Sequence, residues 1–149
     1  MSAVPIYRTE FVSLKGDDVV AEATRRLLTH HVTDLPVVDE DNRLIGMLKL
    51  DRLLGSLLPK AALIGLGMDD LRFLADSLDH LRQQMQAIAD TPVRQLMVKA
   101  EHVVHPDTSP IEIVLQLYRG SSNVPVVERE TNRLVGMVSA RDVLGALQK

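Results

Sequence analysis

The sequence of 149 residues contains no cysteine and few aromatic residues, which make up only 3% of the chain. Without cysteine, disulfide bonds, thiolate zinc fingers and cysteine nucleophiles are excluded. Proteins that bind single-stranded nucleic acid stack bases on aromatic side chains within a basic groove. This chain has a formal net charge of -3 and scattered basic residues, so nucleic acid is not expected as a partner.

Long hydrophobic runs are also missing. No stretch approaches the roughly 18 apolar residues that a membrane-spanning helix needs. The first residues, MSAVPIYRTEF, do not form a positive segment followed by an apolar one, as a secretion signal does. We therefore expect no membrane partner and a cytoplasmic location.

What the sequence does contain is an internal repeat. Residues 42–55 read NRLIGMLKLDRLLG, and residues 132–145 read NRLVGMVSARDVLG. Before each copy comes a short apolar run with a proline, LPVVD at 35–39 and VPVVE at 124–128. Self-similarity of this kind indicates a duplicated structural unit. The 46% of hydrophobic residues are enough for one domain, or for two small halves that share a core.

Each half of the chain predicts the order strand, helix, strand, turn, strand, helix. Asp18 and Ser109 are suitable N-caps for the first helix of each half, and Pro110 suits the first helical position. The β-branched runs favour buried strands, joined by charged turns at 40–43 and 129–133. The second-repeat helix is expected to bury one apolar face, made of Ile111, Val114, Leu115 and Tyr118.

Two glycines within the predicted strands, Gly46 and Gly136, indicate the close approach of another backbone or of a ligand. Neither half can bury its sheet well alone. The sequence therefore predicts a mixed α/β (α+β) fold, in which two tandem β-α-β-β-α repeats pack as one module about a pseudo-twofold axis.

This order of elements, present twice, resembles a pair of cystathionine-β-synthase (CBS) domains, the arrangement called a Bateman module. The resemblance covers residues 1–58 and 92–149, with an inserted helical linker at 59–91. It implies a regulatory protein that holds a ligand in the cleft between its repeats. The ligands it implies are the adenosine nucleotides AMP, ADP and ATP, or S-adenosylmethionine.

The resemblance places the phosphate of such a ligand at Ser139 and its ribose hydroxyls at Asp142. Both residue types suit these roles, because Ser139 ends a strand and opens a helix whose free backbone amides favour an anion. Gly136 is expected to let the adenosine approach the strand. Met137 is expected to offer its backbone to the adenine edge.

Two further candidates, Asn123 before the second apolar run and His105 at the end of the first strand of the second repeat, follow from the same geometry. A purely structural interpretation stays open for the central pair. Ser139 and Asp142 also have the spacing of a capping box, in which each residue hydrogen-bonds the backbone of the other.

The first repeat departs from the pattern. Lys49 stands at the position of Ser139 and Arg52 at that of Asp142, while Asp51 comes one residue early. One residue turns a side chain by about 100° around a helix, so no ordinary ribose site is expected there. Lys49 and Arg52 either hold a phosphate that projects from a nucleotide in the other cleft or form solvated surface.

The sequence offers no catalytic residue and no metal site. The histidine pairs at 30–31 and at 102 and 105 lack a third ligand at useful spacing. No nucleophile stands beside a base, and no glycine-rich phosphate loop is present. We therefore expect a protein that is not an enzyme.

The inserted linker contains a narrow apolar seam. Its residues follow steps of three and four, as in a coiled coil: Leu71, Leu74, Leu78, Leu81, Met85 and Ile88. The seam favours a partner helix from a second copy of the chain over packing within one module.

Two functions remain open at this point. The first is a homodimeric regulatory module that senses an adenosine ligand and signals to a client protein. The second is a ligand-free dimeric scaffold that keeps the fold only for assembly.

Overall fold

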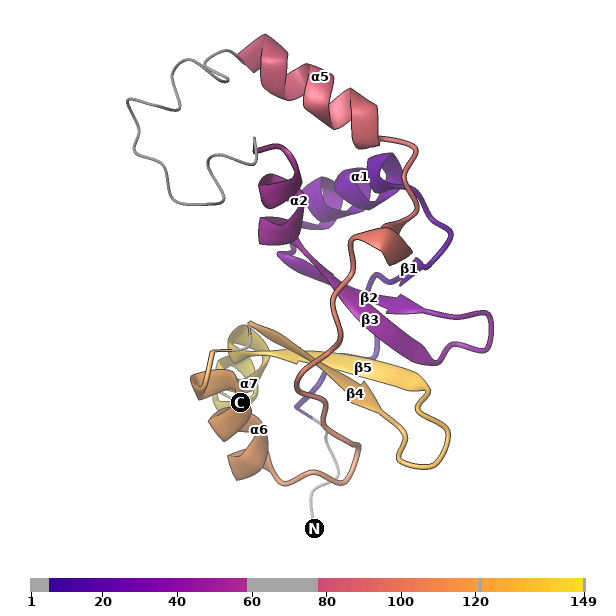
Figure 1. Ribbon diagram of the computed structural model, residues 1–149. Coiled ribbons are helices and arrows are strands. Elements are labelled where there is room, and N and C mark those ends of the chain that lie inside the picture. Colours follow the sequence, from indigo (N-terminus) through magenta and orange to yellow (C-terminus); the bar gives the residue numbers. More distant parts are fainter. Residues whose placement is uncertain (1–5, 59–77, 121, 149) are drawn as a thin grey trace.

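The computed structural model describes residues 6–58, 78–120 and 122–148. Two similar halves lie one above the other, with their strands facing each other and their helices turned away (Figure 1). This arrangement confirms the predicted fold of two repeats packed as one module. Residues 59–77, which include Leu71 and Leu74 of the predicted seam, lie outside the described part of the chain.

The first repeat follows the predicted order of elements. It comprises β1 (Leu14–Lys15), α1 (Val20–His30), β2 (Asp34–Val38), β3 (Leu44–Lys49) and α2 (Leu50–Ser56). The strands form one sheet in the order β1-β2-β3, in which β1 is parallel to β2 and β3 antiparallel. All five residues of β2 are buried, as expected for a central strand covered on both faces.

The second repeat comprises α6 (Pro110–Tyr118), β4 (Asn123–Val127), β5 (Leu134–Ser139) and α7 (Ala140–Leu147). Strands β4 and β5 are antiparallel. The predicted first strand is reduced to a single parallel bridge between Val104 and Val126. Pairing stops there because Pro106 has no backbone N–H to donate to a ladder.

The first segments of the two repeats are exchanged between the two halves. Arg8 pairs with Met137 of β5, and Val98 pairs with Met47 of β3, each in an isolated antiparallel bridge. Backbone hydrogen bonds of 2.8 and 3.0 Å join Arg8 to Met137. The N-terminal segment therefore contributes to the second repeat, and the segment after the linker contributes to the first.

The two strand glycines are explained by this exchange. A Cβ on Gly136 would lie 2.4 Å from Cδ2 of Tyr7 and 2.8 Å from the carbonyl oxygen of Arg8. A Cβ on Gly46 would lie 2.7 Å from Sδ of Met97. The prediction of a close backbone approach is confirmed at both positions.

The core consists of three apolar clusters. One lies within the first repeat and one within the second. The third joins the repeats and contains Val38, Leu44 and Met47 with their counterparts Val127, Leu134 and Met137. Burial of this middle cluster holds the two sheets face to face.

The turns of the two repeats meet on the pseudo-twofold axis. Asn42 and Asn132 have left-handed backbones, with φ of 64° and 61°. The Asn42 amide donates to the Leu134 carbonyl at 2.9 Å, and the Asn132 amide donates to the Leu44 carbonyl at 3.0 Å. Each repeat thereby hydrogen-bonds the start of the other's returning strand.

Of the two predicted N-caps, Ser109 is confirmed and Asp18 is not. Ser109 caps α6 by accepting the Glu112 amide at 3.3 Å, and Pro110 is the first residue of the helix. The prediction for Asp18 is wrong, because the residue before α1 is Val19, whose side chain does not cap it. Instead, the amide of Val20 donates to the carbonyl of Thr91 at 2.9 Å.

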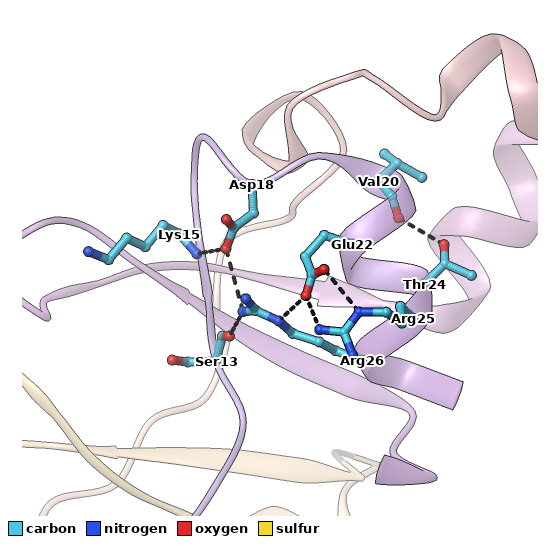
Figure 2. Close-up of polar contacts among 8 residues, drawn as sticks. All are labelled: Ser13, Lys15, Asp18, Val20, Glu22, Thr24, Arg25 and Arg26. Atoms are coloured by element: carbon cyan, nitrogen blue, oxygen red, sulfur yellow. Dashed lines mark hydrogen bonds and ion pairs between the residues drawn. The ribbon is translucent and has the colours of Figure 1, made fainter. Parts of the chain in front are cut away.

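Asp18 takes part in a polar network at the start of α1 (Figure 2). Its Oδ2 accepts the Lys15 amide at 2.8 Å and lies 3.5 Å from Nη1 of Arg26. Glu22 forms ion pairs with Arg25 and Arg26 on the same helix. Hydrogen bonds from both arginines lower the pKa of Glu22 to about 2, and the bond from Arg25 has the larger effect.

The buried face predicted for the second-repeat helix is wrong. Ile111 and Tyr118 of α6 are 82% and 86% exposed. The side that packs on the sheet carries Ile113, which is buried, and Leu117, which is partly buried. Nearly every position of this helix is apolar, so helical spacing alone could not decide which side faces the sheet.

The linker contains α5 (Leu78–Ile88), and a 3-10 turn, η1 (Val93–Gln95), follows the linker. Met85 and Ile88 of the predicted seam pack against the core of the first repeat, whereas Leu78 is 63% exposed. The C-terminal end of the seam therefore serves internal packing.

Candidate functional site

A cleft of about 620 Å³ opens where β5 ends and α7 begins. The first repeat also contributes to its wall, since Thr33, the residue just before β2, lines the cleft. The polar residues that line it include Arg8, Thr33, Asn123, Ser139, Arg141 and Asp142. The volume lies within the range of about 300 to 1,000 Å³ that small-molecule sites occupy.

Ser139 and Asp142 form a complete capping box at the start of α7. The Ser139 amide donates to Asp142 Oδ2 at 2.8 Å, and the Ser139 hydroxyl lies 2.9 Å from the same oxygen. The Asp142 amide donates in turn to Ser139 Oγ at 3.3 Å. The predicted spacing thus builds a cap, and the cap faces the cleft.

Arg8 adds a third donor to the same carboxylate. Its Nε lies 2.9 Å from Asp142 Oδ2, with side chains 40% and 15% exposed respectively. All three hydrogen bonds of the carboxylate go to Oδ2. In the part of the chain that the structure describes, Oδ1 accepts none.

The roles expected for Gly136 and Met137 stay predictions, although the N-terminal segment already contacts both residues. The space beside Gly136 is filled by Tyr7 and by the backbone of Arg8, not left open for adenosine. The amide and the carbonyl of Met137 both hydrogen-bond Arg8, which leaves only the second lone pair of the carbonyl for an adenine edge. The N-terminal segment occupies the strand edge that these predictions assigned to a ligand.

Of the two further candidates, the structure brings only Asn123 to the cleft. Asn123 begins β4 directly opposite Ser139. His105 lies beside the other end of that strand, with Nδ1 2.8 Å from the carbonyl oxygen of Val127. The two ends of β4 are four residue steps apart, a distance of about 13 Å.

The sequence profile described as the CBS domain matches this chain twice, at residues 3–59 and 93–149. The chain belongs to the CBS-domain family. The two matches fall on the two repeats, so the protein is a CBS-domain pair. No curated protein sequence matches it.

Solved structures of other CBS proteins share the fold at low sequence identity. A CBS domain-containing protein of unknown function from Kribbella flavida aligns over 97% of this chain and 96% of its own, with a TM-score of 0.74 and 21% identity. CBSX2, solved in complex with AMP, aligns over 97% of this chain and 92% of its own, with a TM-score of 0.68 and 24% identity. Protein MJ1004 from Methanocaldococcus jannaschii aligns over 97% of this chain, with a TM-score of 0.67 and 21% identity, and the alignment covers 59% of that protein's chain.

The first CBS repeat builds a different pair of hollows. Lys49 lines a cleft of about 410 Å³ together with Thr33, Asp34 and Asp51. Arg52 lines a separate hollow, where its Nε donates to the Leu96 carbonyl at 3.3 Å. Lys49 and Arg52 therefore do not converge on one place, and the suggestion that both hold the same phosphate is not supported.

Several residues that line the clefts were not predicted from the sequence. Arg8 lies outside the repeated motifs and reaches the second CBS repeat only because the N-terminal segment is exchanged. Thr33 and Ser122 line both the larger and the smaller cleft. Asp34 accepts the Ser122 hydroxyl at 2.8 Å. Asp34 occupies the register position that Asn123 has in the second repeat, a correspondence that aligning the two copies could have found.

Among the described residues, no helix is long and apolar enough to cross a membrane.

Proposed function

We propose that this CBS-domain pair is a regulatory protein of the cytoplasm that binds an adenosine nucleotide in the cleft of its second repeat. The observation that carries the proposal is the position of the Ser139–Asp142 capping box, which faces a cleft of about 620 Å³. A helix cap alone needs no such cleft. The AMP complex of CBSX2 supports the ligand class.

The chemistry of the cleft fits the two polar ends of a nucleotide. The N-terminal amides of α7 and the Ser139 hydroxyl favour a phosphate. Asp142 offers a carboxylate to the vicinal hydroxyls of a ribose, and such charge-assisted hydrogen bonds are among the stronger ones. Asn123, opposite Ser139, supplies an amide that can donate and accept.

Thermal melting with AMP, ADP, ATP and S-adenosylmethionine tests the proposal. A ligand at about 100 times its Kd stabilises the folded state by about 2.7 kcal/mol. We expect at least one nucleotide to raise the melting temperature. Asp142→Asn should then weaken nucleotide binding by about tenfold, because neutral hydrogen bonds replace charge-assisted ones.

The matched control is Asp107→Asn, which removes a carboxylate from an exposed pair with Arg129 at 3.0 Å. This change should leave nucleotide affinity unaltered. An Asp142→Asn protein that binds as tightly as its parent would show that Asp142 does not hold the ribose. Calorimetry that finds two equal sites in each chain would contradict the assignment to the second repeat.

The alternative function is a ligand-free scaffold. It is favoured by the hydrogen bonding of Ser139 and Asp142, which is already satisfied within the protein. Under this alternative the melting temperature is the same with every adenosine compound. Asp142→Asn then lowers the stability of the protein and changes no affinity.

In either function we expect a homodimer, through which a ligand or a client protein would act. Large apolar side chains are exposed on α6 and α7, namely Ile111, Val114, Leu115, Tyr118, Leu144 and Leu147. Exposed apolar surface of this kind marks interaction sites. The exposed Leu78 of the linker seam marks the competing surface.

Light scattering distinguishes the two surfaces. We expect the unmodified protein to be a dimer and Ile111→Asp to be a folded monomer, because the change places a charge in an apolar interface. Leu78→Asp should remain a dimer. Monomers produced by Leu78→Asp alone would assign the interface to the seam, and a monomeric parent protein would exclude both.

A further inference from the structure

Arg8 lies in the proposed cleft with its backbone fixed. Its amide and carbonyl hydrogen-bond Met137 of β5 at 2.8 and 3.0 Å. Its guanidinium pairs with Asp142, and the side chain as a whole is 40% exposed. The side chain can therefore change partners within the cleft while its backbone stays in place.

The pairing of Arg8 competes with ribose binding. Asp142 Oδ2 already has three donors, from Arg8 and from the backbone and hydroxyl of Ser139. A ribose diol that uses both carboxylate oxygens needs a place at Oδ2. Of the three donors, Arg8 is the one that can leave without opening the capping box, and its side chain, 40% exposed, already reaches solvent.

The cost of releasing Arg8 depends on the ligand. A phosphate accepts two parallel hydrogen bonds from a guanidinium and so replaces Asp142 as the partner of Arg8. Adenosine has no anion and leaves Arg8 without a partner. S-adenosylmethionine carries a cationic sulfonium at the carbon where a nucleotide carries its phosphate, and Arg8 and Arg141 repel that charge. Its carboxylate lies at the far end of the methionine chain, beside an ammonium group.

From these contacts we infer that Arg8 is a specificity-determining residue, which makes the cleft select phosphorylated adenosine ligands over adenosine and S-adenosylmethionine. The inference rests on the proposed function. It deepens that function by assigning a ligand class that Ser139 and Asp142 alone do not distinguish.

The selection belongs to the second repeat alone. Val98 pairs with Met47 as Arg8 pairs with Met137, so the position of Arg8 is apolar in the first repeat. Asp51 follows β3 at the position that Arg141 has after β5. The smaller cleft thus lacks both arginines, although Lys49 lines it, and it has an additional carboxylate.

Calorimetric titration of AMP and adenosine tests the inference on the full chain. The unmodified protein should bind AMP at least tenfold more tightly than adenosine. Arg8→Gln should weaken AMP binding by about tenfold while adenosine binding stays equal or becomes tighter, because the competitor for Asp142 is gone. Arg8→Lys keeps the charge without the planar fork and should retain part of the preference.

Arg129→Gln is the matched control, since it removes an arginine from an exposed ion pair elsewhere and should change neither affinity. Equal weakening of AMP and adenosine by Arg8→Gln, or no change in either, would overturn the role of Arg8 and leave the nucleotide cleft standing. Failure of the unmodified protein to bind adenosine and every one of AMP, ADP and ATP would overturn the proposed function together with this inference.

Discussion

Gly136→Val should lower the free energy of unfolding by about 3 kcal/mol. The new side chain would meet the ring of Tyr7 and the carbonyl oxygen of Arg8, which lie 2.4 and 2.8 Å from an added Cβ. Overpacking costs about 1 to 3 kcal/mol. The Arg8 backbone can yield only by giving up its hydrogen bonds to Met137, each worth about 0.5 to 1.5 kcal/mol.

Urea unfolding followed by circular dichroism measures the loss, and hydrogen exchange at the Met137 amide reports whether the N-terminal segment has detached. The matched control is Gly145→Ala within α7, where an added Cβ meets nothing within 4 Å. That change should stabilise the protein by about 0.5 to 1 kcal/mol, since glycine is a poor helix former. Stability of Gly136→Val within about 0.5 kcal/mol of the parent would contradict the packing described.

Gly46→Val should be the milder of the two glycine changes. The nearest atom to its added Cβ is the flexible Met97 side chain, and the nearest backbone oxygen, of Val98, lies 3.0 Å away. The two glycines occupy equivalent places in the sequence. The difference in their environments comes from the segments that the two halves exchange.

Much of the fold could be predicted because both repeats contain the same local sequence patterns. The proline before each buried strand, the charged turns and the caps at Ser109 and Ser139 are local features, and local sequence determines them. The repetition itself indicated a pseudo-twofold module. These elements fix the position of α7, and with it the position of the Ser139–Asp142 pair.

The remaining features depend on contacts between residues far apart in the chain. Nothing in the sequence around Arg8 indicates that it pairs with Asp142, 134 residues later. The same exchange places Tyr7 beside Gly136 and Arg8 on the Met137 backbone, contacts that the ligand roles predicted for these two residues did not take into account. Helical spacing likewise could not say which side of α6 faces the sheet, because both sides are apolar.

Asn132→Val is expected to destabilise the protein by about 2 to 4 kcal/mol. Asn132 has a left-handed backbone with φ of 61°, which a β-branched residue adopts at a cost of about 1 to 3 kcal/mol. The change also removes the hydrogen bond from the Asn132 amide to the Leu44 carbonyl, worth about 0.5 to 1.5 kcal/mol. Asparagine suits this turn because it tolerates the left-handed conformation and reaches across to the other repeat.

Asn132→Gly separates the two contributions, since glycine accepts the left-handed backbone freely and loses only the side-chain hydrogen bond. We expect it to cost about 1 kcal/mol in urea unfolding, clearly less than the valine. Asn42→Gly should cost a similar amount, because Asn42 makes the equivalent bond to Leu134 at 2.9 Å. If Asn132→Gly were as damaging as Asn132→Val, the backbone conformation would not be what selects asparagine here. If both glycine variants were as stable as the parent, the paired amides would not be what holds the turns of the two repeats together.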